Sequence, residues 1–192
     1  TYYVSTLYRM GKVEEFQHNY KKAEDFYMQS LEKAKQHKAP LYLSYGGLFK
    51  MYTITNQHQE IANMVKEFET ENFAHTQPLF FVYDFYSHHI DYLIKNTLYE
   101  EALNQSLALK KLISTDAFKS HFSEWFLSER IADIYNAQGN YQKAINELLG
   151  TKALQESLEY RNAERAGLFI KLAKNYLDLK DYKNAQYYSE EA

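Results

Sequence analysis

Three side chains that could bind a metal ion lie close together in the segment YDFYSHHIDYL, residues 83–93. Asp84, His88 and Asp91 stand at positions i, i+4 and i+7, which share one face of an α-helix. They could offer oxygen, nitrogen and oxygen ligands to a divalent metal ion. A metal enzyme also needs a closed pocket that excludes water, and Asp and His are common on solvated helix faces. We therefore expect no metal here, and a metal-dependent enzyme is the least favoured hypothesis.

The rest of the sequence contains no recognised catalytic pattern. It has no Gly-rich phosphate loop, no Gly-x-Ser-x-Gly elbow, no His-Glu-x-x-His pair and no dinucleotide fingerprint. It also has no cysteine, which excludes disulfides and thiolate catalysis. The sequence thus predicts a protein that is not an enzyme and needs no cofactor.

Composition favours a helical fold. The 192 residues include 45% hydrophobic side chains but only six Gly and two Pro, which suits long helices better than a β-sandwich with many turns. The net charge is −3, and acidic and basic residues are interleaved along the chain rather than grouped in blocks, so we expect no direct contact with nucleic acid. No apolar run is long enough to span a bilayer. The sequence lacks an initiating Met and a signal peptide, which indicates a fragment of a longer protein; we favour the cytoplasm, with the periplasm as the alternative.

A short phrase occurs twice in the sequence. GNYQKA occupies residues 139–144 and KDYKNA residues 180–185, and their final residues, Ala144 and Ala185, lie 41 positions apart. The match continues upstream, in Ser128, Ile131, Ala132 and Tyr135 of one copy and Phe169, Leu172, Ala173 and Tyr176 of the other. Similar steps back along the chain reach Ala102, Ile61 and Ala23. The spacing predicts five repeats, at about 2–36, 40–71, 78–113, 117–156 and 161–192.

Each repeat reads as two helices joined by a short turn. Large apolar residues at i, i+3 and i+7 mark one face of the first helix, and the repeated phrase begins the second helix, with Asn140 or Asp181 as its cap. The alanine that ends the phrase lets two antiparallel helices approach closely. Pro40 and Pro78 mark the starts of two first helices. The predicted helices are 2–17, 19–36, 40–55, 58–71, 78–95, 97–113, 117–138, 140–156, 161–179 and 181–192.

These positions resemble the tetratricopeptide repeat, whose pattern combines bulky residues, a small residue, tyrosine and alanine at fixed offsets. The fourth repeat fits best, through Ile131, Ala132, Tyr135, Gly139, Tyr141, Ala144 and Leu148. In the second and third repeats Phe49 and Ile90 replace the small residue and Ile61 replaces the alanine, so we expect these hairpins to be splayed or shifted. The resemblance implies one all-α domain over residues 1–192, a right-handed α-solenoid of about five antiparallel helical hairpins.

In such a solenoid the first helix of each hairpin lines a concave groove. The resemblance implies a polar groove with a few aromatic side chains, suited to an extended peptide or a partner helix. The family's carboxylate clamp is not evident, because lysines and asparagine are scattered among acidic residues. The candidate groove residues are Tyr8, Lys12, Lys50, Asp84, Asp91, Phe126, Glu129, Asp133, Asn136 and Lys174.

The resemblance favours a binding function. It predicts a protein- or peptide-binding scaffold or sensor module of a larger bacterial signalling or transcription-regulatory protein. The alternative is a structural spacer or self-association module, because the apolar face around Ala185 and Tyr188 would need cover, for example from a second copy in a homodimer. We expect the aromatic residues of the third repeat to pack against neighbouring hairpins rather than on a partner; they are Phe80, Phe81, Tyr83, Phe85 and Tyr86.

Overall fold

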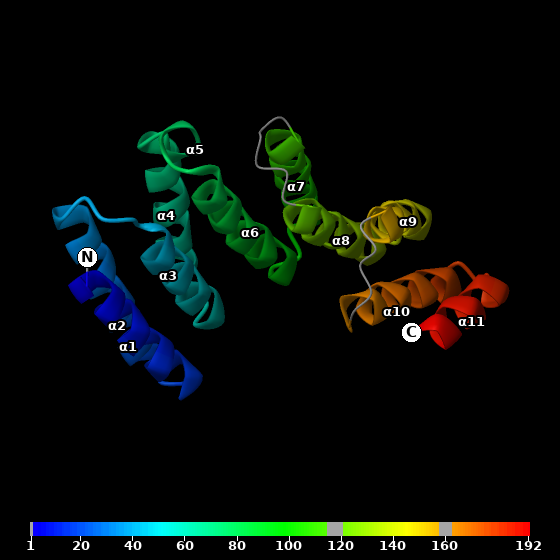
Figure 1. Ribbon diagram of the computed structural model, residues 1–192, viewed down its shortest axis with the longest axis horizontal. Coiled ribbons are helices and arrows are strands. Elements are labelled where there is room, and N and C mark those ends of the chain that lie inside the picture. The colour runs from blue at the N-terminus through cyan, green and yellow to red at the C-terminus, as the bar shows by residue number, and fades with distance from the viewer. Residues whose placement is uncertain (1, 115–120, 158–162) are drawn as a thin grey trace. The chain divides into compact units, whose positions relative to one another are not determined.

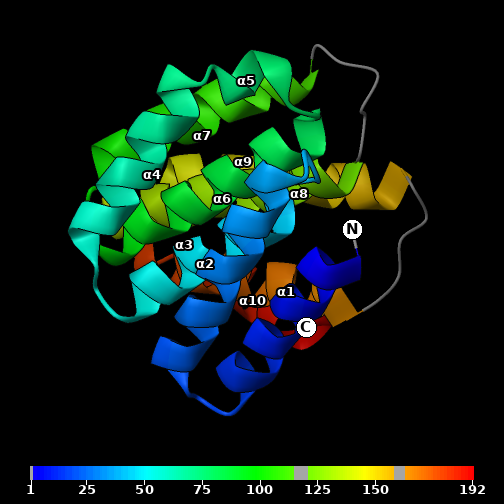
Figure 2. The same ribbon diagram turned by 90° about the vertical axis from the view of Figure 1, so that its left-hand side faces the viewer.

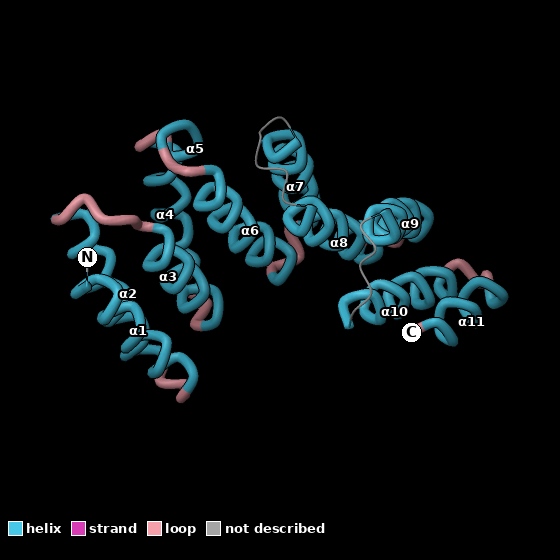
Figure 3. Tube along the Cα trace, in the orientation of Figure 1, coloured by secondary structure: helices cyan, strands magenta, loops and turns pink. Residues whose placement is uncertain are grey.

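The structure, a computed structural model, describes residues 2–114, 121–157 and 163–192. Within these residues the backbone forms α-helices joined by loops, and it contains no strand (Figure 3). The helices are α1 (Tyr2–Phe16), α2 (Tyr20–Gln36), α3 (Tyr42–Ile54), α4 (His58–Thr70), α5 (Phe73–Thr76), α6 (Leu79–Lys95), α7 (Tyr99–Ser114), α8 (His121–Ala137), α9 (Tyr141–Ser157), α10 (Ala163–Asp178) and α11 (Tyr182–Glu191).

The predicted helices agree with the observed ones to within two residues at every described end. The predicted starts at 117 and 161 lie outside the described residues. Asp181 caps α11 as predicted, because its side chain accepts a hydrogen bond from the backbone N–H of Asn184 at 3.2 Å. The short helix α5 was not predicted, since a single turn after the left-handed residue Asn72 leaves no periodic pattern in the sequence.

The chain divides into two compact units, residues 1–92 and 93–192, and the division falls in the last turn of α6. In unit 1, α1 packs along α2, as Figures 1 and 2 both show, and both helices contact α3. In unit 2, each of the helices α7 to α11 packs against the next along the chain. The single domain over 1–192 stays a prediction. Among the described residues, none of the helices has the length and apolar character needed to cross a bilayer.

The turn inside each hairpin has the same backbone geometry. One residue adopts a left-handed conformation, at His18, Asn56, Thr97, Gly139 and Lys180, with φ between 57° and 75°. The N–H of the following residue bonds back to a carbonyl five positions earlier, as from Asn19 to Glu14 at 2.9 Å and from Asn140 to Tyr135 at 2.8 Å. This is the Schellman arrangement that ends a helix. Each hairpin reverses direction through a turn of this geometry at the same place in the repeat. This explains why the phrase that begins in the turn recurs.

The alanine of each phrase is buried where the two helices meet. Ala23, Ala102 and Ala144 have no exposed surface, and Ala185 is nearly as buried. The prediction that Tyr188 needs external cover was wrong, because its ring packs against those of Phe169 and Tyr176 at centroid distances of 5.7 and 5.6 Å. The exposed large apolar side chains described in the last hairpin are instead Ile170, Leu177, Leu179, Tyr182 and Tyr187.

The second hairpin is splayed, as expected from its degenerate sequence. α3 and α4 approach each other over a much shorter stretch than α1 and α2 do, and the buried Ile61 takes the place of the alanine. Aromatic rings from α4, α5 and α6 fill the space between the splayed helices. The ring of Phe68 stacks on that of Phe85 at a centroid distance of 3.9 Å, and the ring of Phe73 meets Phe68 edge-on at 5.6 Å. Phe81 and Phe85 are thus packed as predicted, whereas Phe80 stays 40% exposed.

Candidate functional site

The first helices of three successive hairpins, α1, α3 and α6, line one pocket of about 490 Å³ in unit 1. We call it the unit 1 pocket. Of the ten predicted groove residues, the structure brings four together in its lining: Tyr8, Lys12, Lys50 and Asp84. Asp91, about two helical turns beyond Asp84 on α6, is exposed and does not line it.

Beneath this pocket, the ring of Tyr27 reaches from α2 between α1 and α3. Two glycines make room for it: a Cβ on Gly11 would lie 2.5 Å from a Tyr27 ring atom, and one on Gly47 would lie 2.8 Å away. Tyr27 is fully buried, and its hydroxyl donates a hydrogen bond of 2.6 Å to Oε2 of Glu15. Burial and the Glu15 carboxylate raise the pKa of Tyr27, so the phenol remains a donor.

Glu15 holds two lysines at one point of the pocket. Its Oε1 accepts hydrogen bonds from Lys12 Nζ at 3.1 Å and from Lys50 Nζ at 2.5 Å. Burial alone would raise the pKa of Glu15, but the bonds from Lys50, Tyr27 and Lys12 outweigh it and lower this pKa to about 2. Sequence reasoning missed Glu15. The only signal was that Lys12 lies three residues before this carboxylate, on a helix face whose other residues are mostly apolar.

A carboxylate and an imidazole, those of Asp84 and His88, lie close together on α6, across from Gly46 of α3. Asp84 Oδ1 is 3.8 Å from His88 Nε2, and Asp84 Oδ2 lies only 3.0 Å from the place where a Cβ of Gly46 would stand. Burial raises the pKa of Asp84, and the nearby His88 opposes that shift. The metal hypothesis finds no support, because in the described part of the chain no three His, Asp or Glu side chains are arranged to hold a metal ion.

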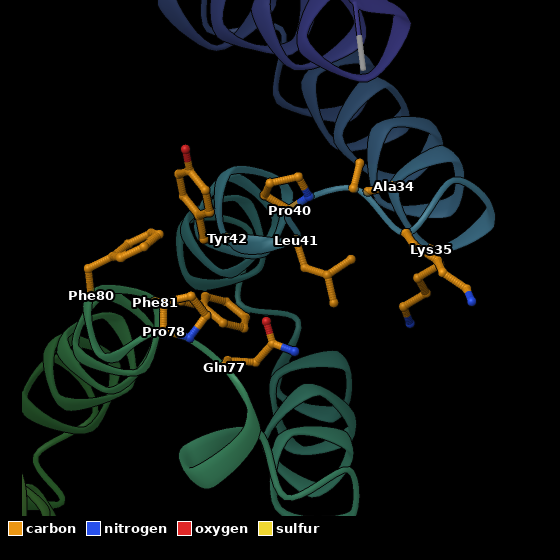
Figure 4. A pocket seen from close by; sticks show the side chains of 11 residues that line it. Ala34, Lys35, Pro40, Leu41, Tyr42, Gln77, Pro78, Phe80 and Phe81 are labelled. Atoms are coloured by element: carbon orange, nitrogen blue, oxygen red, sulfur yellow. The ribbon is translucent and has the colours of Figure 1, made fainter.

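Two aromatic rings separate the unit 1 pocket from a neighbouring one. Tyr42 and Phe80 line both pockets and meet edge to face at 4.8 Å. The neighbour has a volume of about 520 Å³ and lies between the loops that carry Pro40 and Pro78, so we call it the proline pocket. Figure 4 shows the Phe80 ring turned toward Tyr42 on one side of this pocket, with Lys35 on the opposite side.

The remaining predicted groove residues lie in unit 2, and the structure separates them. Glu129 and Asp133 of α8 share Lys171 of α10, at 3.1 and 2.8 Å, and Glu129 also accepts a bond of 2.6 Å from the Trp125 indole. Although burial lowers the pKa of Lys171, Asp133 and Glu129 raise it overall. The exposed Phe126 also lies on α8.

Asn136 and Lys174 have different surroundings. The Asn136 amide donates to Asn175 at 3.0 Å and to Asp178 at 3.3 Å. Lys174 lines a pocket of about 490 Å³ formed by α10 and α11 together with Leu177. The predicted set in unit 2 is therefore distributed over three places.

The fold is that of an all-α helical-repeat protein of the tetratricopeptide-like type, as predicted. No protein-family model matches the sequence, and no curated protein matches it. Solved structures do match. A signal transduction ATPase with a tetratricopeptide repeat sensor from Pyrococcus horikoshii is 19% identical over 96% of this chain, with a TM-score of 0.79. BtubC from P. vanneervenii is 14% identical over 98% of this chain, with a TM-score of 0.81.

A third similar structure is that of NprR in complex with its cognate peptide NprX. It is 16% identical over 98% of this chain, with a TM-score of 0.64. The chain spans 28% of the Pyrococcus horikoshii protein, 77% of BtubC and 53% of NprR. At these identities the comparisons show the fold alone.

Proposed function

We propose that this chain is a binding module that holds a peptide, or an extended segment of a partner protein, in the unit 1 pocket. The observation that carries this proposal is the convergence of polar and aromatic side chains from α1, α3 and α6 on one pocket of about 490 Å³. The lysines of the pocket are each 48% exposed, so they keep N–H donors available for the carbonyl groups of a ligand backbone.

The role in the cell that we propose follows from the same site. NprR is a protein of similar fold described with a cognate peptide, and the Pyrococcus horikoshii protein uses its repeats as a sensor. We assign to this chain the same kind of role, a non-catalytic sensor or scaffold module of a bacterial signalling or transcription-regulatory protein. A ligand that spans α1, α3 and α6 would fix three helices relative to one another, which is how binding in a repeat stack becomes a change of shape.

The experiment is a selection of peptides from a random display library on the purified chain, followed by fluorescence anisotropy with the labelled peptides. Tyr8→Ala and Lys50→Ala should each weaken binding at least tenfold, with helical circular dichroism retained. Lys22→Ala is the matched control, because Lys22 is an exposed lysine of α2 outside the pocket, and it should leave the dissociation constant unchanged. Selection of no peptide, or equal affinities for all variants, would refute the proposal.

Self-association is a second candidate function, and one observation favours it. Ile170, Leu177 and Tyr182 remain more than half exposed on the last hairpin, so a second copy could cover them. Sedimentation velocity over a hundredfold range of concentration tests this. A dimer that Leu177→Lys disrupts would support self-association, whereas a monomer throughout would exclude it.

A further inference from the structure

The unit 1 pocket has a positive and a negative end. At the positive end, two ammonium groups share the single carboxylate of Glu15, which leaves one net positive charge. Both oxygens of Glu15 are already used, because Oε2 accepts from Tyr27 and Lys12. The ammonium groups therefore have N–H donors to spare but no further acceptor on Glu15.

At the negative end, Asp84 is only weakly compensated. Its carboxylate is 47% exposed, and its ion-pair partner among the described residues is His88 at 3.8 Å, which is longer than either lysine contact of Glu15 at Oε1. Gly46 presents no side chain toward it. A ligand cation can therefore reach Asp84 from the pocket, and the partial burial of this carboxylate makes such a cation favourable.

The distance between the two ends suits an extended peptide. Gly46, next to Asp84, and Lys50, bound to Glu15, are four residues apart on α3, so they lie about 6 Å apart along the helix axis. In an extended chain, side chains at positions i and i+2 point to the same side and are about 6–7 Å apart. Two ligand side chains separated by one residue can thus reach both ends at once.

The aromatic walls favour a basic side chain at the Asp84 end. Tyr42 and Phe80 line the pocket together with Asp84, and aromatic rings pack well against the aliphatic stem of lysine or the plane of a guanidinium group. Tyr8 also lines this pocket, and burial, Glu15 and Asp84 raise the pKa of its phenol. Its phenol is therefore kept in the protonated, donating form.

We propose that the unit 1 pocket selects peptide segments in which a basic and an acidic side chain are separated by one residue. The lysine or arginine of the ligand pairs with Asp84, and its glutamate or aspartate pairs with Lys12 and Lys50. This inference rests on the proposed function and adds the charge pattern of the ligand to it.

The test uses capped, fluorescein-labelled peptides of one Ser/Tyr background that carry Lys-x-Glu, Glu-x-Lys, Lys-x-Gln, Gln-x-Glu or Gln-x-Gln at their centre. Binding to the full chain is measured by anisotropy at low and high salt. The better of the two peptides with both charges should bind at least tenfold more tightly than the uncharged one. This gain should shrink at high salt, because part of it is exposed charge pairing.

Two variants identify which end of the pocket pairs with which charged side chain of the ligand. Asp84→Asn should abolish the gain from the ligand's lysine and keep the gain from its glutamate, and Lys50→Gln should do the reverse. Asp25→Asn is the matched control, because Asp25 is an exposed carboxylate of α2 that does not line the pocket. Circular dichroism confirms that each variant is folded.

The outcomes separate this inference from the proposed function. Peptides that bind, and that Tyr8→Ala weakens, but whose affinity changes less than twofold with the charge pair would overturn the charge pattern alone. If neither these peptides nor those selected by display bind, both proposals are wrong.

Discussion

The packing of Tyr27 between two glycines leads to a prediction that can be worked out from distances. In Gly11→Ala the new methyl carbon would lie 2.5, 2.7 and 3.0 Å from three atoms of the Tyr27 ring, well inside van der Waals contact. The ring has little room to move toward α3, because Gly47 packs against the same ring so closely that a Cβ there would lie 2.8 Å from Cδ1 of Tyr27. The overlap must therefore push α1 away from α2 and α3.

The net cost follows from two opposing effects. Overpacking of a core by one methyl group costs about 1–3 kcal/mol, and the absence of any free direction places this site at the upper end. Alanine gains about 1 kcal/mol over glycine in a helix interior. Gly11→Ala should therefore lower the free energy of unfolding by about 2 kcal/mol, which is about 4–8 °C in Tm for a chain of this size.

The assay is thermal and urea unfolding followed by circular dichroism. Gly150→Ala is the matched control: Gly150 lies inside α9, a Cβ there would meet nothing within 4 Å, and the variant should gain up to about 1 kcal/mol. Gly11→Ala should cost less in a Tyr27→Leu background than in the parent chain, because the smaller side chain leaves room for the methyl group. If Gly11→Ala were as stabilising as Gly150→Ala, the close packing inferred for Tyr27 would be refuted.

Three further predictions concern single residues. The folded state lowers the pKa of Glu15 from an ordinary 4.5 to about 2. The ionised carboxylate therefore adds about 3 kcal/mol to the free energy of unfolding above pH 5, and this contribution is lost as the pH falls from about 4.5 to 2. Acid unfolding of Glu15→Gln should lack this pH-dependent component. Thr97→Gly should stabilise the chain by about 0.5–1 kcal/mol in urea unfolding, because a β-branched residue is strained at a φ of 61°; an unchanged midpoint would contradict this. Ile61→Ala restores the alanine of the repeat pattern, yet should cost about 2–4 kcal/mol by the same measurement, since Ile61 is fully buried; a more stable variant would show that the second hairpin closes up.

The helices could be predicted from sequence because their ends are decided locally. The three residues of each turn, together with the buried alanine that follows in four of the five repeats, fix where one helix ends and the next begins, and they recur at nearly constant spacing. The prediction was least informative at α5, where Phe73 is buried among rings of α4 and α6. The position of α5 depends on how far α3 and α4 diverge, and no local sequence pattern predicts this divergence.

The candidate site could be predicted only in part, for a physical reason. The resemblance to the tetratricopeptide repeat places Tyr8, Lys12, Lys50 and Asp84 on the groove side of their helices, and in the structure these four line one pocket. The sequence alone does not reveal that Glu15 neutralises part of the charge of both lysines, because Lys50 lies 35 residues from Glu15 along the chain. In unit 2 the same reasoning grouped Lys174 with Asn136, although the first lines the α10 and α11 pocket and the second bonds to Asn175.

The repeat pattern and the unit 1 pocket use different edges of the same helices. The pattern is set by the packing edges, where alanine, glycine and aromatic rings must fit within a few tenths of an ångström, as at Gly11 and Gly47. On the groove edge, charged side chains can be exchanged with little effect on the fold, provided that a buried group such as Glu15 keeps its partners. A helical-repeat stack can therefore keep its architecture while its ligand changes. Asp84, beside Gly46, and Lys50, when its replacement still donates a hydrogen bond to Glu15, are consequently the positions where a substitution should change the proposed ligand binding while leaving the helices in place.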